Sequence, residues 1–208
     1  MPPPFQLNAG HPALDFVNTL DNRFSDAGPV ELLTRYAELL SFVRQSQLVE
    51  STRINALEER RESRAAAKAL RSAHELREAL ADVFYPGIDA TGIRPMGIKT
   101  LERHFLNAQG HRRLILDPAP GQSGMPPRAA WTWGPFETHV ELPLWVLARS
   151  AVELLTSSAA DHVNQCRSET CRWLFLDTSK NHSRRWCDMK ICGNRMKARR
   201  FQVRHAGA

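Results

Sequence analysis

The four cysteines of this 208-residue chain all lie in its last fifth, as two Cys-x4-Cys pairs separated by fifteen residues. A tetrahedral zinc ion needs four soft donors at about 2.3 Å, and two local pairs joined by a short excursion supply them at a small loop-closure cost. We therefore predict one Zn²⁺ ion in this segment. Its predicted ligands are Cys166, Cys171, Cys187 and Cys192.

Other interpretations of the cysteines are open at this point. The thiols could be inert and buried or form a redox pair, and His162 or His182 could replace one of the ligands. Four cysteine ligands leave no coordination position for water, so the predicted zinc is structural and not catalytic. The sequence also shows no nucleophile elbow, phosphate-binding loop or suggestively spaced carboxylate pair, so we expect that the protein is not an enzyme.

Positive charge is concentrated in the same segment. Residues 162–208 hold 11 Lys and Arg against 3 Asp and Glu, a balance of +8, whereas residues 1–161 carry −2. A four-thiolate zinc site brings a charge of about −2, which leaves about +6 to face outward and predicts a polyanionic partner. A solvated or protein-facing basic surface is the alternative.

No long apolar run interrupts the chain. The longest, Leu144 to Ala148, is too short to cross a bilayer, and residues 1–5 lack the charged and apolar regions of a secretory signal. We therefore expect a cytoplasmic protein without membrane association. In the cytosol thiols stay reduced, which favours metal binding over disulfides.

The first 160 residues have the pattern of a helical domain, and the fold is predicted to be mainly α (α+β). Apolar residues at helical spacing predict helices over residues 30–49, 51 to about 84, 96 to about 110 and 143 to about 157. The sequence Tyr85-Pro86-Gly87 is expected to end the second helix. The third is expected to point Ile98, Leu101, Phe105 and Leu106 inward.

Two further parts of this domain have less regular patterns. Residues 11–20 fit either a short strand or a helical turn. Residues 113–116 and 130–133 predict a small β-hairpin, joined by a flexible loop at 118–127 that is rich in Pro and Gly.

The C-terminal segment, residues 161–208, is predicted to form a separate small zinc finger of one β-hairpin and a short helix. Residues 173–177 have strand composition and are expected to return through residues 184–186 to the second cysteine pair. A helix over residues 193–204 would place Cys192, Met196 and Val203 on one stripe facing the metal.

The motifs in this segment resemble those of the CGNR zinc-finger family. They are the two cysteine pairs, Phe175-Leu176-Asp177, the run from Ser183 to Met189, and Cys192-Gly193-Asn194-Arg195. The run from Leu14 to Thr19 is similar to the start of the ABATE domain, which usually precedes this finger in bacterial proteins. The resemblance implies a stress-related transcription regulator that holds zinc through the four cysteines and binds DNA.

We therefore expect a zinc-dependent DNA-binding regulator. If about six cations neutralise phosphates, the logarithm of the affinity should fall with the logarithm of the salt concentration at a slope of roughly −5. The predicted DNA contacts are Arg184, Arg185, Arg195, Lys197, Arg199, Arg200 and Arg204. The alternative function is a zinc-stabilised protein-interaction module that does not touch nucleic acid.

The helical domain is larger than an anchor for the finger requires, which suggests a sensor or interaction domain. Its effector would be a protein partner or a small molecule, bound in a pocket near Asp15, Asn18 and Trp131. The alternative is that such polar residues serve as helix caps and hydrogen bonds of the core.

Overall fold

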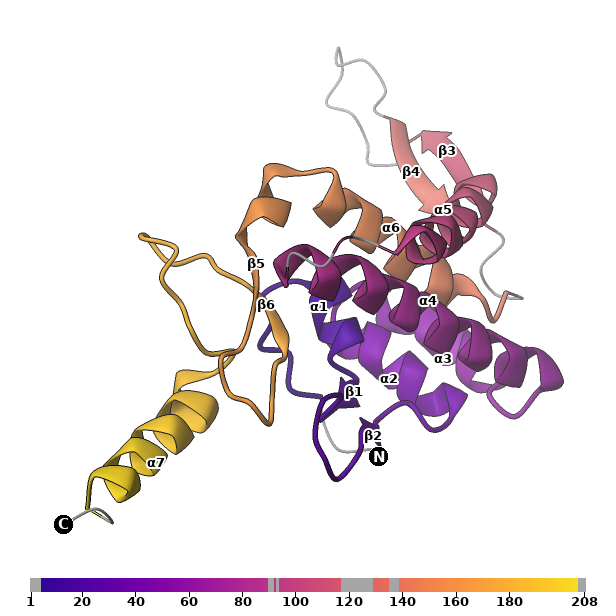
Figure 1. Ribbon diagram of the computed structural model, residues 1–208. Helices are drawn as coiled ribbons and strands as arrows, with labels where there is room; N and C mark the ends of the chain where they lie inside the picture. Colours follow the sequence, from indigo (N-terminus) through magenta and orange to yellow (C-terminus); the bar gives the residue numbers. More distant parts are fainter. Residues whose placement is uncertain (1–4, 90–91, 93, 117–128, 135–138, 206–208) are drawn as a thin grey trace, which may run out of the picture.

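Helices dominate the computed structural model, which describes residues 5–89, 92, 94–116, 129–134 and 139–205 (Figure 1). The strands form three separate antiparallel pairs, β1–β2, β3–β4 and β5–β6. The mainly α prediction is confirmed. The elements in chain order are α1 (Pro12–Val17), β1 (Leu20–Asp21), β2 (Val30–Glu31), α2 (Tyr36–Gln45), α3 (Ser51–Glu58), α4 (Arg64–Ile88), α5 (Pro95–Gly110), β3 (Arg112–Leu116), β4 (Ala129–Trp133), α6 (Leu142–Leu155), η1 (Ser158–His162), β5 (Val163–Gln165), β6 (Leu174–Leu176), η2 (Met189–Gly193) and α7 (Asn194–His205).

Helix α6 lies at the centre of the body and packs against α1, α2, α4 and α5. Nearly every one of its side chains from Leu142 to Ala151 is buried, as expected of a helix that is apolar all round. Helix α4 covers this core with one stripe, which includes Ala73, Leu76 and Leu80. The two helices thus build the core from an all-apolar helix and an amphipathic one.

Helix α5 packs closely on α4 at Gly97. A Cβ atom at this position would lie 2.9 Å from the Asp82 Cβ and 3.0 Å from the Ala79 carbonyl, so only glycine fits without a shift. The predicted start of this helix is confirmed. Its predicted inner face is wrong in part: Leu101 is buried, Phe105 is half-buried, and Ile98 and Leu106 are exposed.

Two of the predicted helices have different boundaries. The helix predicted over 30–49 begins only at Tyr36, because residues 30–31 pair with β1 and the Glu38 carboxylate accepts a hydrogen bond from the Arg35 N–H at the start of the helix. The helix predicted from 51 to about 84 is two helices, since the Ser63 side chain accepts a hydrogen bond from the Ala66 N–H and starts α4 anew.

The predicted end of that helix at residues 85–87 is also wrong. Helix α4 continues through Pro86, and the Asp89 N–H donates to the Tyr85 carbonyl at 2.9 Å. A proline in the last turn removes one N–H bond and leaves the bonds that follow it intact. Residues 11–20 contain a helical turn, α1, followed by the start of β1.

The predicted hairpin of residues 113–116 and 130–133 is confirmed as β3 and β4, in which Leu114 pairs with Trp131. The loop predicted at 118–127 lies outside the described residues. Within the described part of the chain, no helix combines the length and hydrophobicity that a bilayer span requires.

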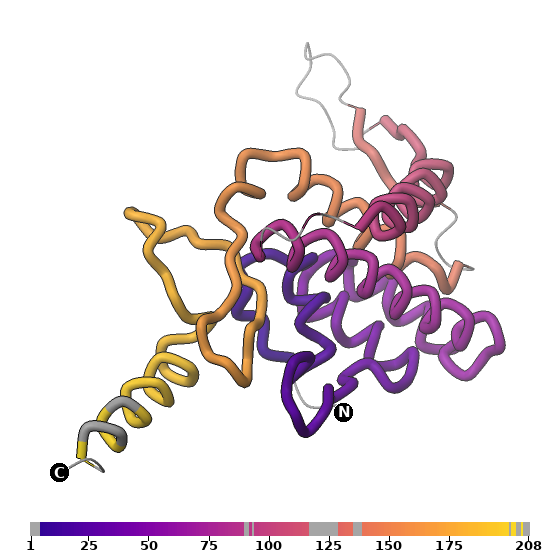
Figure 2. Tube along the Cα trace, in the orientation of Figure 1, coloured from indigo at the N-terminus to yellow at the C-terminus, as the bar shows by residue number. Residues whose placement is uncertain are grey.

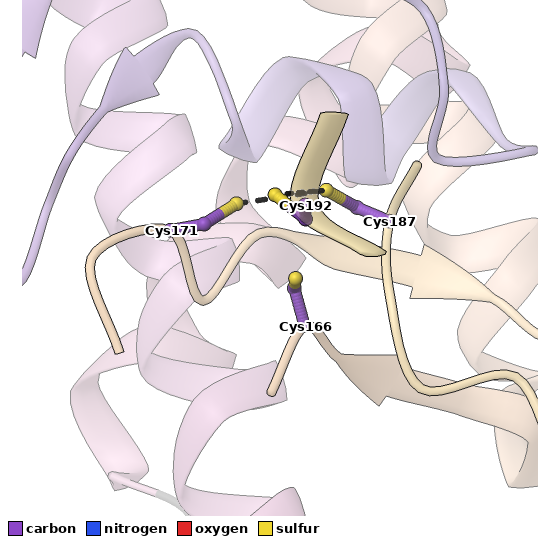
Figure 3. Close-up of side chains that lie close together, drawn as sticks. All are labelled: Cys166, Cys171, Cys187 and Cys192. Carbon is purple, nitrogen blue, oxygen red and sulfur yellow. Dashed lines mark hydrogen bonds between the residues drawn. The ribbon is translucent and has the colours of Figure 1, made fainter. Parts of the chain in front are cut away.

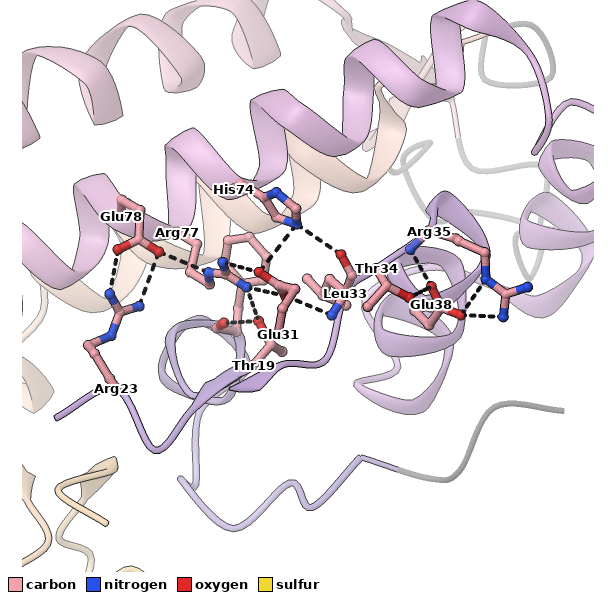
Figure 4. Close-up of polar contacts among 11 residues, drawn as sticks. Thr19, Arg23, Glu31, Leu33, Thr34, Arg35, Glu38, His74, Arg77 and Glu78 are labelled. Carbon is pink, nitrogen blue, oxygen red and sulfur yellow. Dashed lines mark hydrogen bonds and ion pairs between the residues drawn. The ribbon is translucent and has the colours of Figure 1, made fainter. Parts of the chain in front are cut away.

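A buried ion-pair network fixes the short β1–β2 pair on α4 (Figure 4). Arg77 is only 3% exposed and donates to both carboxylate oxygens of Glu31, at 2.6 and 2.7 Å, and to the Thr19 hydroxyl at 3.2 Å. Burial is the largest single influence on Glu31 and would raise its pKa, but the hydrogen bonds and charge of Arg77, the Leu33 N–H and the nearby His74 together hold that pKa below its ordinary value. The charge of Arg77 is therefore paired inside the body.

The β5–β6 pair shares the core of the body. Val163 and Leu174 belong to the same buried cluster as α6, and β5 and β6 contact α4 and α1. A second, smaller cluster holds Phe175 and three of the cysteines. The division of the chain at residue 160 stays a prediction, but the finger segment is anchored in the body by these strands.

Candidate metal centre

The four cysteine sulfurs converge on one point (Figure 3). All four Sγ atoms lie within 4.8 Å of one another, with Cys171 and Cys187 3.5 Å apart and Cys187 and Cys192 3.7 Å apart. A tetrahedron with metal–sulfur bonds of about 2.3 Å has sulfur–sulfur edges of about 3.8 Å. A disulfide would need about 2.05 Å. The spacing therefore fits a single tetrahedral ion, and all four thiols are free.

The thiols cannot share this space as four anions without a cation. The pKa of Cys166 lies far below its ordinary value, because the neighbouring thiols of Cys171 and Cys187 stabilise its thiolate. The same contacts raise the pKa of Cys171 and Cys187, and burial raises that of Cys192. A divalent ion would displace the protons, which is the chemistry of a cysteine-only zinc site.

Strands β5 and β6 place the first cysteine pair. The Cys166 N–H donates to the Trp173 carbonyl at 2.8 Å, directly after the ladder of β5 and β6. The predicted strand pairing is wrong, since β6 pairs with β5 and not with residues 184–186. The returning segment makes a single backbone bond in this region, from the Arg167 N–H to the Arg185 carbonyl.

Asp177 organises the loop between β6 and the second pair. Its buried carboxylate accepts hydrogen bonds from the Ser179 N–H at 2.9 Å, the Ser179 hydroxyl at 2.6 Å and the Arg184 N–H at 2.8 Å. In the motif Phe175-Leu176-Asp177, Phe175 is thus a core side chain, and Asp177 holds the following loop by hydrogen bonds.

A π-helical turn, η2, carries the last cysteine into α7. Asp188 caps it by accepting from the N–H groups of Lys190 at 2.6 Å and Ile191 at 3.0 Å. A Cβ atom at position 193 would lie 2.4 Å from the Met189 sulfur, so Gly193 makes room for that side chain. Cys192 is buried at this turn, and a metal bound there would fix the start of α7.

Arg184 does not belong to the basic surface, contrary to the prediction. Its guanidinium donates to the carbonyl oxygens of Trp186 at 2.9 Å and Asn8 at 3.0 Å, and also to that of Cys187. It further lies 4.5 Å from the centroid of the Phe175 ring. Arg184 therefore has a structural role: its hydrogen bonds link the metal loop to the N-terminal segment.

The other predicted DNA contacts lie on the surface where they are described. Arg185 and Lys197 are exposed and have no side-chain partner among the described residues. Arg195 donates to the Thr170 hydroxyl at 3.3 Å, and Arg199 pairs with Glu169 at 2.7 Å. The side chains of Arg200 and Arg204 lie outside the described residues.

Three further basic residues of the finger are exposed but were not among the predicted DNA contacts. Arg167, Lys180 and Lys190 are exposed, and their side chains have no described partner. They lie between the cysteines and not in the basic run after them. Their only signal in the sequence was their share of the segment's charge.

The predicted pocket at Asp15, Asn18 and Trp131 is wrong. Asp15 accepts the Ala9 N–H at 2.9 Å, and Asn18 is 3% exposed and hydrogen-bonded to backbone. Trp131 is 59% exposed on the β3–β4 hairpin, which stands away from α1, and Arg112 lies 4.5 Å from its ring centroid (Figure 1). The alternative of core hydrogen bonds explains the first two residues.

Asn18 instead holds the finger on the body. Its amide accepts the Leu174 N–H and donates to the Leu174 carbonyl, both at 2.9 Å, along the outer edge of β6. The Leu176 N–H on the same edge donates to the Ala9 carbonyl at 2.7 Å. The backbone groups on the outer edge of β6 therefore find their hydrogen-bond partners in the body.

His162 and His182 do not join the cysteine cluster. Their rings stack on each other at 3.8 Å, and the metal-binding group found in the described residues contains the four cysteines only. A cavity of about 220 Å³ lies beside the centre, and its lining includes Asp21 and Asn22 of the body and Asp188 and Arg195 of the finger.

Comparison with known families assigns both parts of the chain. The ABATE model, described as "Putative stress-induced transcription regulator", matches residues 10–158, well over half of the sequence. The model of the CGNR zinc finger matches residues 162–205. A search of curated proteins gave no match.

Proposed function

Because the chain belongs to the ABATE family and carries a CGNR zinc finger after that domain, we propose that it is a zinc-dependent transcription regulator that binds DNA. The family description supports a stress signal as its input. One structural Zn²⁺ would hold the finger, and four sulfur ligands leave it no catalytic position. The proposed place of action is the bacterial cytoplasm, where DNA is accessible and thiols stay reduced.

The observation that carries the proposal is the exposure of the finger's cations. Five of them have no described side-chain partner, and the ion pair of Arg199 is on the surface, where such a pair contributes little. Helix α7 projects away from the body as the most basic element (Figure 2). The five unpartnered cations are Arg167, Lys180, Arg185, Lys190 and Lys197.

The test is a salt titration of the zinc-loaded full chain with a fluorescent 20-base-pair duplex of random sequence, followed by anisotropy. With three to five phosphates neutralised, we expect a log–log slope of about −3 to −5. The double variant Arg185→Ala, Lys197→Ala should lose about 2 units of slope. Lys68→Ala removes an exposed charge from α4 and serves as the matched control.

Absence of binding, or a slope near zero, would refute the proposal. The alternative is that the finger docks an acidic protein. It would gain support if a nuclease-treated pull-down still recovered a partner while DNA binding was absent.

We further propose that the ABATE part controls the finger. The body forms hydrogen bonds to β6 through Asn18 and Ala9, and the cavity of about 220 Å³ lies at the same junction. A small molecule in that cavity would contact both parts at once. Thermal-shift screening should find ligands whose effect is lost in Gln6→Ala, since Gln6 lines the cavity and takes no part in the metal centre, and a screen without hits would leave a protein effector.

A further inference from the structure

Helix α7 has one fully open face. At 100° per residue, Asn194, Lys197, Ala198, Phe201 and His205 fall within an arc of about 100°. All five are exposed, and Phe201 is 65% exposed although it is the largest apolar side chain of the helix. We call these five residues the open stripe of α7.

The opposite side of α7 is where the helix is attached. Met196 is half-buried, and it alone among the described side chains of α7 is not exposed. Arg195 and Arg199 reach from the adjoining face to Thr170 and Glu169 on the metal loop. The attachment therefore turns the open stripe away from the finger, and Figure 1 shows the helix standing clear of the body.

The stripe combines three kinds of side chain. The Asn194 amide makes no hydrogen bond within the described part of the chain, so its donor and acceptor are available. Ala198 and Phe201 offer apolar contact, and the Phe201 ring is supported by His205 at 4.2 Å between centroids. Lys197 adds a charge at the edge, and the helix contains no acidic residue.

This combination matches the major-groove edge of A·T base pairs. An asparagine amide can pair with the N6 and N7 atoms of adenine, and alanine and phenylalanine side chains contact the thymine methyl group. Building on the proposed DNA binding, we propose that the open stripe lies in the major groove and reads adenine with Asn194 and thymine methyl groups with Ala198 and Phe201.

The dimensions of the helix agree with this placement. Its twelve residues span about 18 Å, and Asn194 and Phe201 are about 10 Å apart along the axis, close to three base-pair steps. A single α-helix fits the major groove, which is about 12 Å wide. Lys197 at the edge of the stripe then lies nearest the phosphates.

The first test selects binding duplexes from a random pool with the zinc-loaded full chain. We expect the selected sites to contain an A·T-rich core of about three base pairs. Asn194→Ala should weaken binding to that core by about 5- to 150-fold and relax the preference at one position. Lys197→Ala should instead weaken all sequences alike and lower the salt slope by about 0.9.

The second test replaces the thymines of the selected site by uracil, which removes only the methyl groups. Affinity should fall about fourfold for each contacted methyl. In Phe201→Ala this loss should shrink, because the contact is already gone. Unchanged zinc content and helicity of each variant would exclude unfolding as the cause.

Several outcomes would overturn the inference. These are DNA binding without an A·T preference, an Asn194→Ala variant with unchanged selection, or an equal uracil effect in Phe201→Ala and the parent. Each of them leaves the proposed DNA binding intact. Complete absence of DNA binding would instead refute the proposed function, and loss of a protein partner in Phe201→Ala would then assign the stripe to that partner.

Discussion

Replacing Arg184 by alanine should lower the stability of the finger without changing the salt dependence of DNA binding. The guanidinium makes well-formed hydrogen bonds to the carbonyl oxygens of Trp186 and Asn8, at 2.9 and 3.0 Å. A hydrogen bond to a charged group contributes about 1.5–3 kcal/mol, and the contact with the Phe175 ring adds about 0.5–1 kcal/mol. Because Arg184 is only half-buried, we take the lower end of both ranges, and its two hydrogen bonds and the ring contact then add to a loss of about 3.5 kcal/mol of stability for Arg184→Ala.

The assay is urea unfolding of the zinc-loaded chain, followed by far-ultraviolet circular dichroism and by zinc release to a chromogenic chelator. Arg185→Ala is the matched control, because Arg185 is the next residue, carries the same charge and has no described side-chain partner. It should change stability by no more than about 0.5 kcal/mol. In the salt titration the pattern should reverse, with a loss of about 0.9 in slope for Arg185→Ala only. A stability loss below about 1 kcal/mol for Arg184→Ala, together with a reduced salt slope of DNA binding, would refute the structural role of Arg184.

Three further perturbations follow from the contacts between finger and body. Asn18→Ala leaves the buried N–H and carbonyl groups of Leu174 unpaired and should cost about 2–4 kcal/mol in urea unfolding; a loss below about 1 kcal/mol would contradict the role of this amide. Chelation of zinc should melt α7, because a polar helix of twelve residues is marginal alone, while β5–β6 stays docked in the body core. Hydrogen exchange should therefore lose protection over residues 189–205 but keep it at Leu174, and loss at both would show that the hairpin depends on the metal. Burial raises the pKa of Asp15 to about 6, above its ordinary value, so its protonated form favours folding and this stability is lost as the pH rises through about 6. Asp15→Asn should remove that loss, and the difference in urea midpoint between variant and parent should grow from pH 4 to pH 7.

Local patterns predicted the metal centre well. The four cysteines are close in sequence, and their types and spacing determine both the ligand set and the tetrahedral preference. The β3–β4 hairpin and the start of α5 were also local, since each is defined by its own periodicity and by a flanking proline or glycine.

The errors concern interactions between residues that are distant in sequence. The break between α3 and α4 could not be predicted, because residues 59–63 have helical composition. Only the hydrogen bond of the Ser63 side chain with the Ala66 N–H reveals where α4 begins. Strand β6 pairs with β5 because its other edge is occupied by Asn18, more than 150 positions away. Arg184 looks like any other arginine of the basic run, and only the carbonyl groups around it reveal its role.

The distribution of positive charge in the finger therefore has two causes. Arg172 pairs with Asp89 of the body at 3.0 Å, and Arg184 is bound by carbonyl groups, so both stabilise the junction. The cations that remain for a partner lie on the metal loops and on α7, which are the parts that the four sulfurs order. Because the body holds β6 while a metal would hold α7, a signal that loosens the body would move the basic surface without removing its charge. Regulation of such a protein would then act on the orientation of α7, and an effector should change its affinity for a selected site more than its salt slope.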